Sequence, residues 1–210
     1  KHAKGFDVER LDRMIYTAMQ LSFKMGVFHH IQSTGEVLFT ANLPIWDKAR
    51  AAHLAAVERS PTVEVMKQAY MYFLIDGVMI FDRHQQERQA DLIFDELAQR
   101  FPQDTGCRHR EPYVLPKLVG EDFNALARDE ALAYIEGFLF EGTIMRVIGR
   151  REAAEGAERQ ALLIYNKYQQ SKSMDSEFFE RMGIRQPFAY FVQQARTKVL
   201  EIYGANALGD

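Results

Sequence analysis

Apolar side chains recur every three or four positions through most of this sequence, and this spacing constrains the fold more than any other feature. Such a period places the apolar residues along one stripe of an α-helix, and another element must cover that stripe to remove it from water. The sequence therefore predicts an all-α protein built as an irregular bundle of six to eight helices. We expect one domain over residues 1–210, with two packed helical halves as the alternative arrangement.

The first predicted helix begins after Asp7, a good N-cap residue, and ends before residues 33–35. One face of it carries residues at helical spacing, namely Val8, Leu11, Ile15, Ala18, Ser22 and Met25, and Met14, Met19 and Leu21 widen this face. Because charged residues lie away from it, we expect the apolar face to cover the core. Residues 36–40 could form a short strand, but no partner strand is evident, so an extended connector is the preferred interpretation.

Further helices are predicted from the same spacing and from capping residues, prolines and glycines at their ends. They cover residues 44–59, 61–81, 83–101, 121–148, 151–170, 175–182 and 187–203, and Gly77 is a possible break within the second of these. In helix 151–170 the face expected to be inward carries Ala157, Ala161, Ile164 and Tyr168. In helix 121–148 it carries Phe123, Leu126, Ala127, Tyr134, Phe138, Met145 and Ile148. Gly137 and Gly142 weaken that helix and are expected to allow close helix approach.

Residues 102–120 form the most irregular stretch, with three prolines and two glycines. Structureless loops of this length are uncommon within compact domains. This stretch is therefore the best candidate for a boundary between two helical halves.

The net charge is −3, and this balance excludes the strongly basic character expected of a duplex-binding protein, so we expect no nucleic-acid partner. The single cysteine excludes an internal disulfide and a cysteine-built zinc site, and it favours a cytoplasmic location. The apolar stretch 63–81 is interrupted by charges, which indicates a core helix rather than a membrane-spanning segment. The chain starts without methionine, which suggests a fragment of a larger protein whose signal or anchor would not be seen.

The common catalytic and phosphate-binding motifs are absent, and no histidine has a glutamate three positions before it, as a di-iron bundle requires. We expect no metal and no cofactor. His29 and His30, expected at the end of the first helix, diverge by about 100° and could not easily share a metal, so favourable helix-dipole placement is the simpler interpretation. Asp82, His84 and Glu87 could form an acid–base pair or metal site, but a solvated first helical turn explains them as well.

Basic residues provide the candidate partner-binding sites. Arg108, His109 and Arg110 follow Cys107 in the irregular stretch, where adjacent cations could also raise the thiolate fraction of the cysteine. Arg146, Arg150 and Arg151 flank a helix junction and could bind an acidic peptide or another anion. Solvation and helix-dipole placement are the alternatives for both groups.

The chain is also rich in soft and aromatic side chains, with 15 Phe, 9 Tyr and 9 Met. Tyr70, Tyr72 and Phe73, together with Tyr165 and Tyr168, cover more than one side of their helices, which indicates an interface as well as a core. The leading hypothesis is a non-enzymatic protein–protein interaction or assembly (adaptor) domain. Its partner would be an acidic or helical segment of another protein, or a second copy. The alternatives are a regulatory domain enclosing a small apolar molecule, and an enzyme with an unrecognised site.

Overall fold

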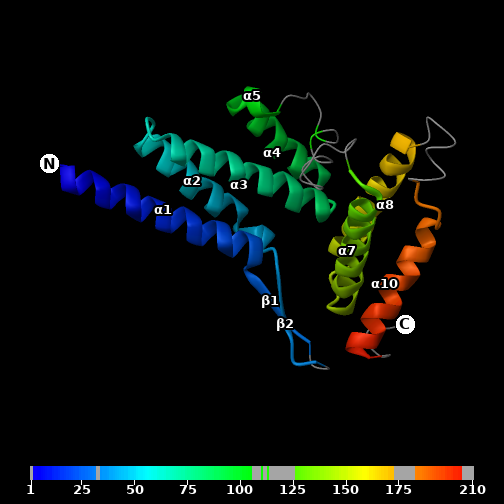
Figure 1. The fold of residues 1–210 in the computed structure, drawn as a ribbon. Helices are drawn as coiled ribbons and strands as arrows, with labels where there is room; N and C mark the ends of the chain where they lie inside the picture. The colour runs from blue at the N-terminus through cyan, green and yellow to red at the C-terminus, as the bar shows by residue number, and fades with distance from the viewer. Residues whose placement is uncertain are drawn as a thin grey trace. The chain divides into compact units, whose positions relative to one another are not determined.

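The computed structural model describes residues 2–31, 34–105, 110, 113, 126–172 and 183–204, and it confirms the all-α prediction (Figure 1). The elements in chain order are α1 (His2–Met25), β1 (Val27–His30), β2 (Val37–Thr40), η1 (Leu43–Ile45), α2 (Trp46–Arg59), α3 (Glu64–Arg83), α4 (Glu87–Arg100), α5 (Pro102–Thr105), α7 (Arg128–Val147), α8 (Arg151–Lys172) and α10 (Phe188–Tyr203). They form two compact units: unit 1 comprises residues 1–81 and 87–106, and unit 2 comprises residues 82–86 and 107–210. The boundaries of independently folding domains stay a prediction.

Aromatic rings from three helices form the core of unit 1. Trp46 of α2 stacks on Phe73 of α3 with ring centroids 4.5 Å apart, while Phe23 of α1 and Phe81 of α3 pack against the same indole. A Cβ on Gly77 would lie 2.3 Å from that indole, so only glycine leaves room for it. The helix therefore does not break at Gly77, and α3 runs on to Arg83.

A buried histidine lies within this aromatic core. The ring of His53 stacks between Tyr16, at 4.5 Å, and Phe73, at 4.4 Å, and neither ring nitrogen has a hydrogen-bond partner in the structure. Burial lowers the pKa of His53 to about 4, because the charged imidazolium would lose its hydration there. The imidazole is thus neutral at pH 7 and serves as a packing group.

A carboxylate cluster joins α2, α3 and α4 at the edge of this core. Glu96 accepts hydrogen bonds from Arg50 at 2.7 and 2.9 Å, from the Tyr70 hydroxyl at 2.6 Å and from Arg100 at 2.9 Å. Burial opposes ionisation of Glu96, but the bonds from Arg50 and Tyr70 outweigh it and lower the pKa of the carboxyl group. The cluster therefore supports helix packing as an ionised, fully hydrogen-bonded group.

The hairpin between α1 and α2 was not expected. Two predictions are wrong here: residues 37–40 do have a partner strand, and His29 and His30 lie in that strand rather than at a helix end. The two strands pair antiparallel, with Phe28 opposite Phe39 and His30 opposite Val37. Helix α1 stops at Met25 because the chain turns at Gly26, where a Cβ would lie 1.9 Å from the Ser22 carbonyl oxygen.

Helices α7 and α8 pack closely in unit 2. A Cβ added at Gly142 would lie 3.0 Å from the Ala154 carbonyl oxygen, which confirms the predicted close approach, whereas Gly137 faces open space. All four residues predicted inward on α8 are buried, namely Ala157, Ala161, Ile164 and Tyr168.

The face predicted inward on α7 is mostly wrong, although Leu126, just before the helix, is buried as predicted. Tyr134, Phe138 and Met145 are only half-buried and Ala127 is exposed, while the neighbouring face is covered instead. That covered face carries Ala131, Ile135, Leu139, Gly142, Thr143 and Ile144. Small residues on it allow the contact with α8, which outweighs the larger side chains beside it.

The other predicted helix starts are less accurate: α1 begins at His2 rather than after Asp7, and α7 begins at Arg128 rather than at residue 121. Most of the remaining helix ends shift by only a few residues. Helix α4 starts at Glu87 rather than Arg83, after a turn in which Gln85 has a φ of 57°. Helix α10 follows Pro187 and ends at Gly204, whose φ of 87° favours glycine. The predicted helix 175–182 and Phe123 lie outside the described residues.

Candidate interaction surface

Helix α1 has two apolar faces, and the structure covers the one that the sequence did not favour. Asp12, Tyr16 and Phe23 are 5, 6 and 0 % exposed and face the rest of unit 1. The prediction that the face beginning at Val8 covers the core is wrong. The face with Tyr16 and Phe23 is buried because these two rings pack in the aromatic core. On the same face, Asp12 accepts two hydrogen bonds from Arg59 of α2, at 2.6 and 3.0 Å.

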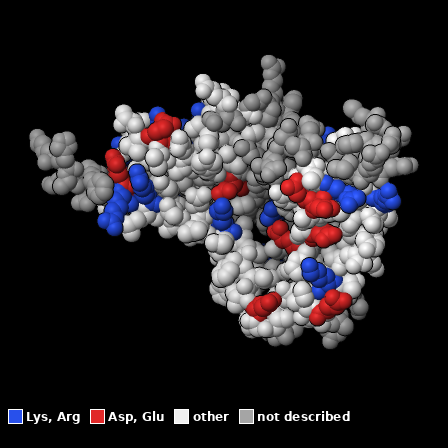
Figure 2. Space-filling model, in the orientation of Figure 1, with Lys and Arg blue, Asp and Glu red and all other residues white. Residues whose placement is uncertain are grey.

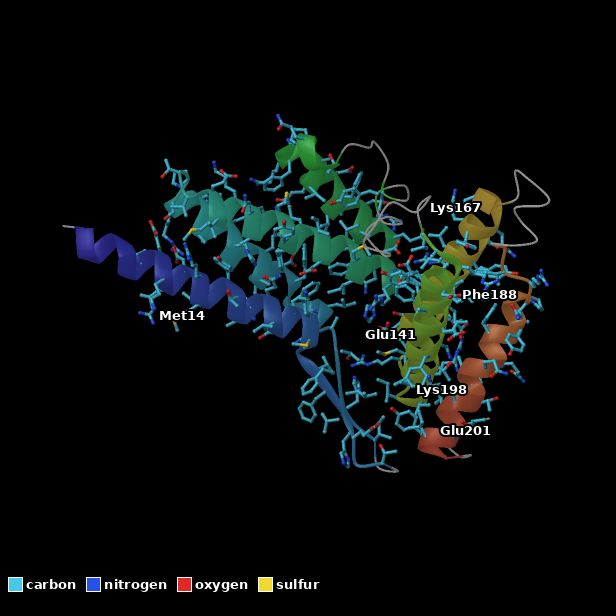
Figure 3. All side chains as sticks on the ribbon, in the orientation of Figure 1. Met14, Glu141, Lys167, Phe188, Lys198 and Glu201 are labelled. Carbon is cyan, nitrogen blue, oxygen red and sulfur yellow. The ribbon has the colours of Figure 1, made fainter. Side chains whose placement is uncertain are left out.

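The face that stays uncovered is called the α1 stripe below. It consists of Val8, Leu11, Met14, Ile15, Ala18, Leu21, Ser22 and Met25, all of them exposed except Ser22, which is half-buried. Its six large apolar side chains are 46–61 % exposed, with Met14 the most exposed. Figure 3 shows Met14 on the side of α1 that turns away from α2 and α3. No charged residue interrupts the stripe.

The hairpin adds a second exposed apolar area, called the hairpin face. Phe28 and Phe39 are cross-strand partners, so their side chains share one side of the hairpin with His30 and Val37. Phe28 is 73 % exposed and Phe39 is 60 % exposed. The missed signal in the sequence was a glycine shortly before each short segment: Gly26 precedes β1, and Gly35, with a φ of 74°, lies in the turn before β2.

Figure 2 shows one face of the molecule, on which the basic and acidic side chains of the described residues are interspersed. They form no broad patch of a single charge there. Many of them are paired. Lys24 of α1, for example, lies 2.9 Å from Asp76 of α3. The apolar surface of α1 is therefore the more distinctive feature of unit 1.

Of the six basic residues predicted to bind a partner, Arg110 and Arg146 form ion pairs within unit 2. Arg110 donates to Asp82, and Arg146 donates to both oxygens of Glu158 at 3.0 and 2.8 Å. Arg150 interacts electrostatically with His84. Arg151 is exposed at the start of α8. Arg108 and His109 lie outside the described residues, as does Cys107. The partner-binding role of these six basic residues stays a prediction.

The group around Asp82 is a dense polar network rather than an open site. Besides Arg110, the Asp82 carboxylate accepts a hydrogen bond from the buried Gln160 at 3.3 Å and lies 3.8 Å from Arg159. Burial, and then the nearby cations Arg83 and Arg150, lower the pKa of His84. His84 belongs to unit 2, whereas Glu87 starts α4 in unit 1.

The neighbouring Arg83 and Gly156 attach the end of α3 within unit 2. Arg83 lies 2.9 Å from Glu141 and donates to Gln160 at 3.3 Å. A Cβ on Gly156 would overlap the Arg83 carbonyl group, so glycine is required for this approach. These contacts hold the helices of unit 2 in place, and the carboxylates of Glu141 and Asp82 are engaged by Arg83 and Arg110.

The tyrosines that indicated an interface are mostly buried. Tyr70, Phe73 and Tyr168 are at most 1 % exposed and belong to the core, and Tyr165 donates a hydrogen bond to the Gln186 carbonyl at 3.0 Å. Only Tyr72 among these five residues is largely exposed, at 60 %. The exposed apolar surface is thus found mainly on α1 and the hairpin rather than around these residues.

Within the described ranges, no group of three or more His, Cys, Asp or Glu side chains could hold a metal ion. The helices of that part of the chain also include none with the length and apolar character needed to cross a membrane. Comparison with known proteins gave no match to a protein-family model, to a curated protein or to a solved structure.

Proposed function

We propose that this protein is a helical interaction module that binds other protein through the α1 stripe and the hairpin face. One observation carries the proposal. Of the fifteen exposed large apolar side chains in the described residues, nine lie within residues 8–39. Scattered exposed apolar residues are normal, but a concentration of this kind is typical of interaction sites.

The size of the uncovered surface supports the proposal. Full burial of a large apolar side chain contributes about 1.5–3 kcal/mol, so a half-exposed one could contribute roughly 1 kcal/mol on association. The free energy gained by burying nine such side chains is large enough to offset the translational and rotational entropy lost when two molecules associate, which costs at least about 4 kcal/mol. The monomer obtains none of this contribution from the α1 stripe, because unit 1 uses the other face of α1.

The chemistry of the polar clusters favours a structural role for them. Asp82 and Glu96 are each held by several donors, so neither carboxylate is open to a substrate proton. Arg146 is paired in the same way with Glu158. These residues therefore support helix packing, and the apolar surface of unit 1 is the better candidate for function.

The test compares three forms of the tagged full chain in extracts of the cells that make it. The second form carries Leu11→Glu and Ile15→Glu in the α1 stripe. The third carries Leu92→Glu on α4, a matched control because Leu92 and Leu11 are both 56 % exposed. Circular dichroism confirms that all three forms are folded, as expected for exposed positions.

We expect proteins retained by the natural sequence, including untagged copies of itself, to be lost from the double variant and kept by Leu92→Glu. Mass spectrometry of the retained proteins provides the measurement. Equal retention by all three forms would contradict the proposal.

A further inference from the structure

The spacing of the α1 stripe points to a more specific partner. Val8, Leu11, Ile15, Ala18, Ser22 and Met25 alternate in steps of three and four residues. This is the period by which one helix packs along another over several turns, with side chains inserted between those of the facing helix. Met14 and Leu21 add an apolar edge to the same stripe.

We propose that the partner is a second copy of this chain, and that the two α1 helices pair antiparallel along their stripes around a twofold axis between residues 16 and 17. This inference rests on the proposed function of the same surface. An isologous contact of this kind uses the same residues on both copies.

The order of large and small side chains supports the antiparallel direction. In that arrangement Ile15 faces Ala18 of the second copy, and Leu11 faces Ser22 of the second copy. Each layer then combines a large side chain with a small one, which fills the space between two helices well. A parallel pair would instead place alanine against alanine and serine against serine, leaving voids at two of its layers.

The end layers also match, because Val8 faces Met25 of the second copy. Six layers then extend over residues 8–25, a length of about 26 Å at 1.5 Å per residue. The hairpin begins just after Met25, so it lies beside the start of α1 of the second copy. Phe28 and Phe39, the most exposed rings of the hairpin face, are available for that contact.

The available area agrees with a stable dimer. An aliphatic side chain is somewhat smaller than an aromatic one, which offers about 150–250 Å² when fully exposed, so the six half-exposed side chains of the α1 stripe leave on the order of 500 Å² uncovered in each copy. The hairpin face raises this toward the ~800 Å² that each partner contributes to a standard interface.

The charges around the stripe favour protein over a lipid surface. Helices that lie on membranes are rich in Lys and Arg on their polar face. The polar positions of α1 instead carry both signs, with Arg10, Arg13 and Lys24 alongside Glu9 and Asp12. Lys24 is paired with Asp76, and Asp12 with Arg59. The stripe itself is uncharged, so two copies meet without like-charge repulsion.

The experiment measures the mass of the purified full chain by sedimentation equilibrium over a range of concentrations. We expect a dimer for the natural sequence and for Leu92→Glu. Ile15→Glu alone and Ala18→Arg alone should each raise the dimer dissociation constant by about 100-fold, because each would bury an unpaired charge. Both positions are exposed in the single copy, and circular dichroism establishes that the variants are folded.

Mixing the two variants tests the direction of pairing. In the antiparallel pair Glu at position 15 faces Arg at position 18 of the other chain, so a mixture should regain dimerisation to within about 10-fold of the natural sequence. In a parallel pair these two positions do not face each other. A dimer without this rescue, or a dimer insensitive to Ile15→Glu, would overturn the inference.

A monomer at every concentration would also overturn it. If the cell-extract experiment then still showed a different protein lost from the Leu11→Glu/Ile15→Glu variant, the proposed function would stand and only the identity of the partner would change. If that experiment also showed no difference, both would fail.

Discussion

Helices α1 and α8 carry the same kind of sequence pattern but differ in how the fold uses it. On α8 the predicted apolar face is covered, and Ala157, Ala161 and Ile164 are inaccessible to solvent. On α1 the predicted face remains about half-exposed, and a second face with Tyr16 and Phe23 is buried instead. A periodic apolar face therefore identifies a helix and a surface to be covered, but it does not identify what covers it.

The side chains on each helix explain the difference. The covered face of α8 is mostly alanine, so α7 approaches it closely at Gly142. The covered face of α1 instead provides two rings for the aromatic core and one carboxylate for Arg59. Because α1 has apolar residues on both faces, one of them stays uncovered in unit 1.

The largest expected effect compares one isoleucine from each helix. Ile164→Ala on α8 should lower the free energy of unfolding by about 2–5 kcal/mol, because it leaves a cavity in a closed core. The Ile15 side chain on α1 is 52 % exposed, so Ile15→Ala should change the free energy of unfolding of the monomer by less than about 0.5 kcal/mol. Urea unfolding followed by circular dichroism, at protein concentrations low enough to keep the chain monomeric, measures both. Similar losses at the two positions would show that the α1 stripe is covered in solution.

The next effect concerns pH and the covered face of α1, where Tyr16 stacks on His53. The pKa of His53 falls from 6.5 in the unfolded chain to about 4 in the folded one. The unfolded state therefore binds the proton first, and stability is lost as the pH falls from 6.5 to 4. A difference of this size corresponds to about 3 kcal/mol. Trp46, the single tryptophan, lies in the same core, so its fluorescence during urea unfolding reports unit 1.

The control for this prediction is His53→Leu, which keeps an apolar group of similar size and cannot be protonated. It should remove the part of this stability loss that comes from His53, and leave the part that comes from His84 of unit 2, whose pKa is also lowered. The lowered pKa of Glu96 stabilises the folded state above the usual pKa near 4.5, and this stabilisation is lost only as the pH falls below that value. The effect of Glu96 therefore falls at the lower end of the titration. An unchanged pH profile in His53→Leu would show that the imidazole is accessible to protons in the folded state.

The sequence predicted the elements of the fold better than their contacts. The helices of unit 1, the inward face of α8 and the close approach at Gly142 follow from apolar spacing and glycine position, which are local properties. The hairpin was missed because β1 and β2 are four residues each and depend on each other. The covered faces of α1 and α7 were missed because they depend on which helix becomes the neighbour, and spacing within one helix does not contain that information.

The same limit applies to the candidate site. The sequence identified the residues of the α1 stripe as apolar and helical but assigned them to the core, since an exposed stripe and a buried one have the same pattern. Arg110 and Arg146, two of the residues predicted to bind a partner, pair with Asp82 and Glu158, which lie 28 and 12 positions away in the chain. Long-range pairing of charges is not visible in composition or local order.

The smallest expected effect tests how tightly a covered face is closed, using two glycines of α7. Alanine favours a helix over glycine by about 1 kcal/mol, so Gly137→Ala, which enters open space, should raise the free energy of unfolding by about that amount. Gly142→Ala gains the same helix preference but places its methyl group 3.0 Å from the Ala154 carbonyl oxygen, so its net effect should be near zero or destabilising. The difference between the two variants in urea unfolding measures the contact between α7 and α8. If both substitutions stabilised the protein equally, the α8 face would be loosely covered, and the contrast with the α1 stripe would weaken.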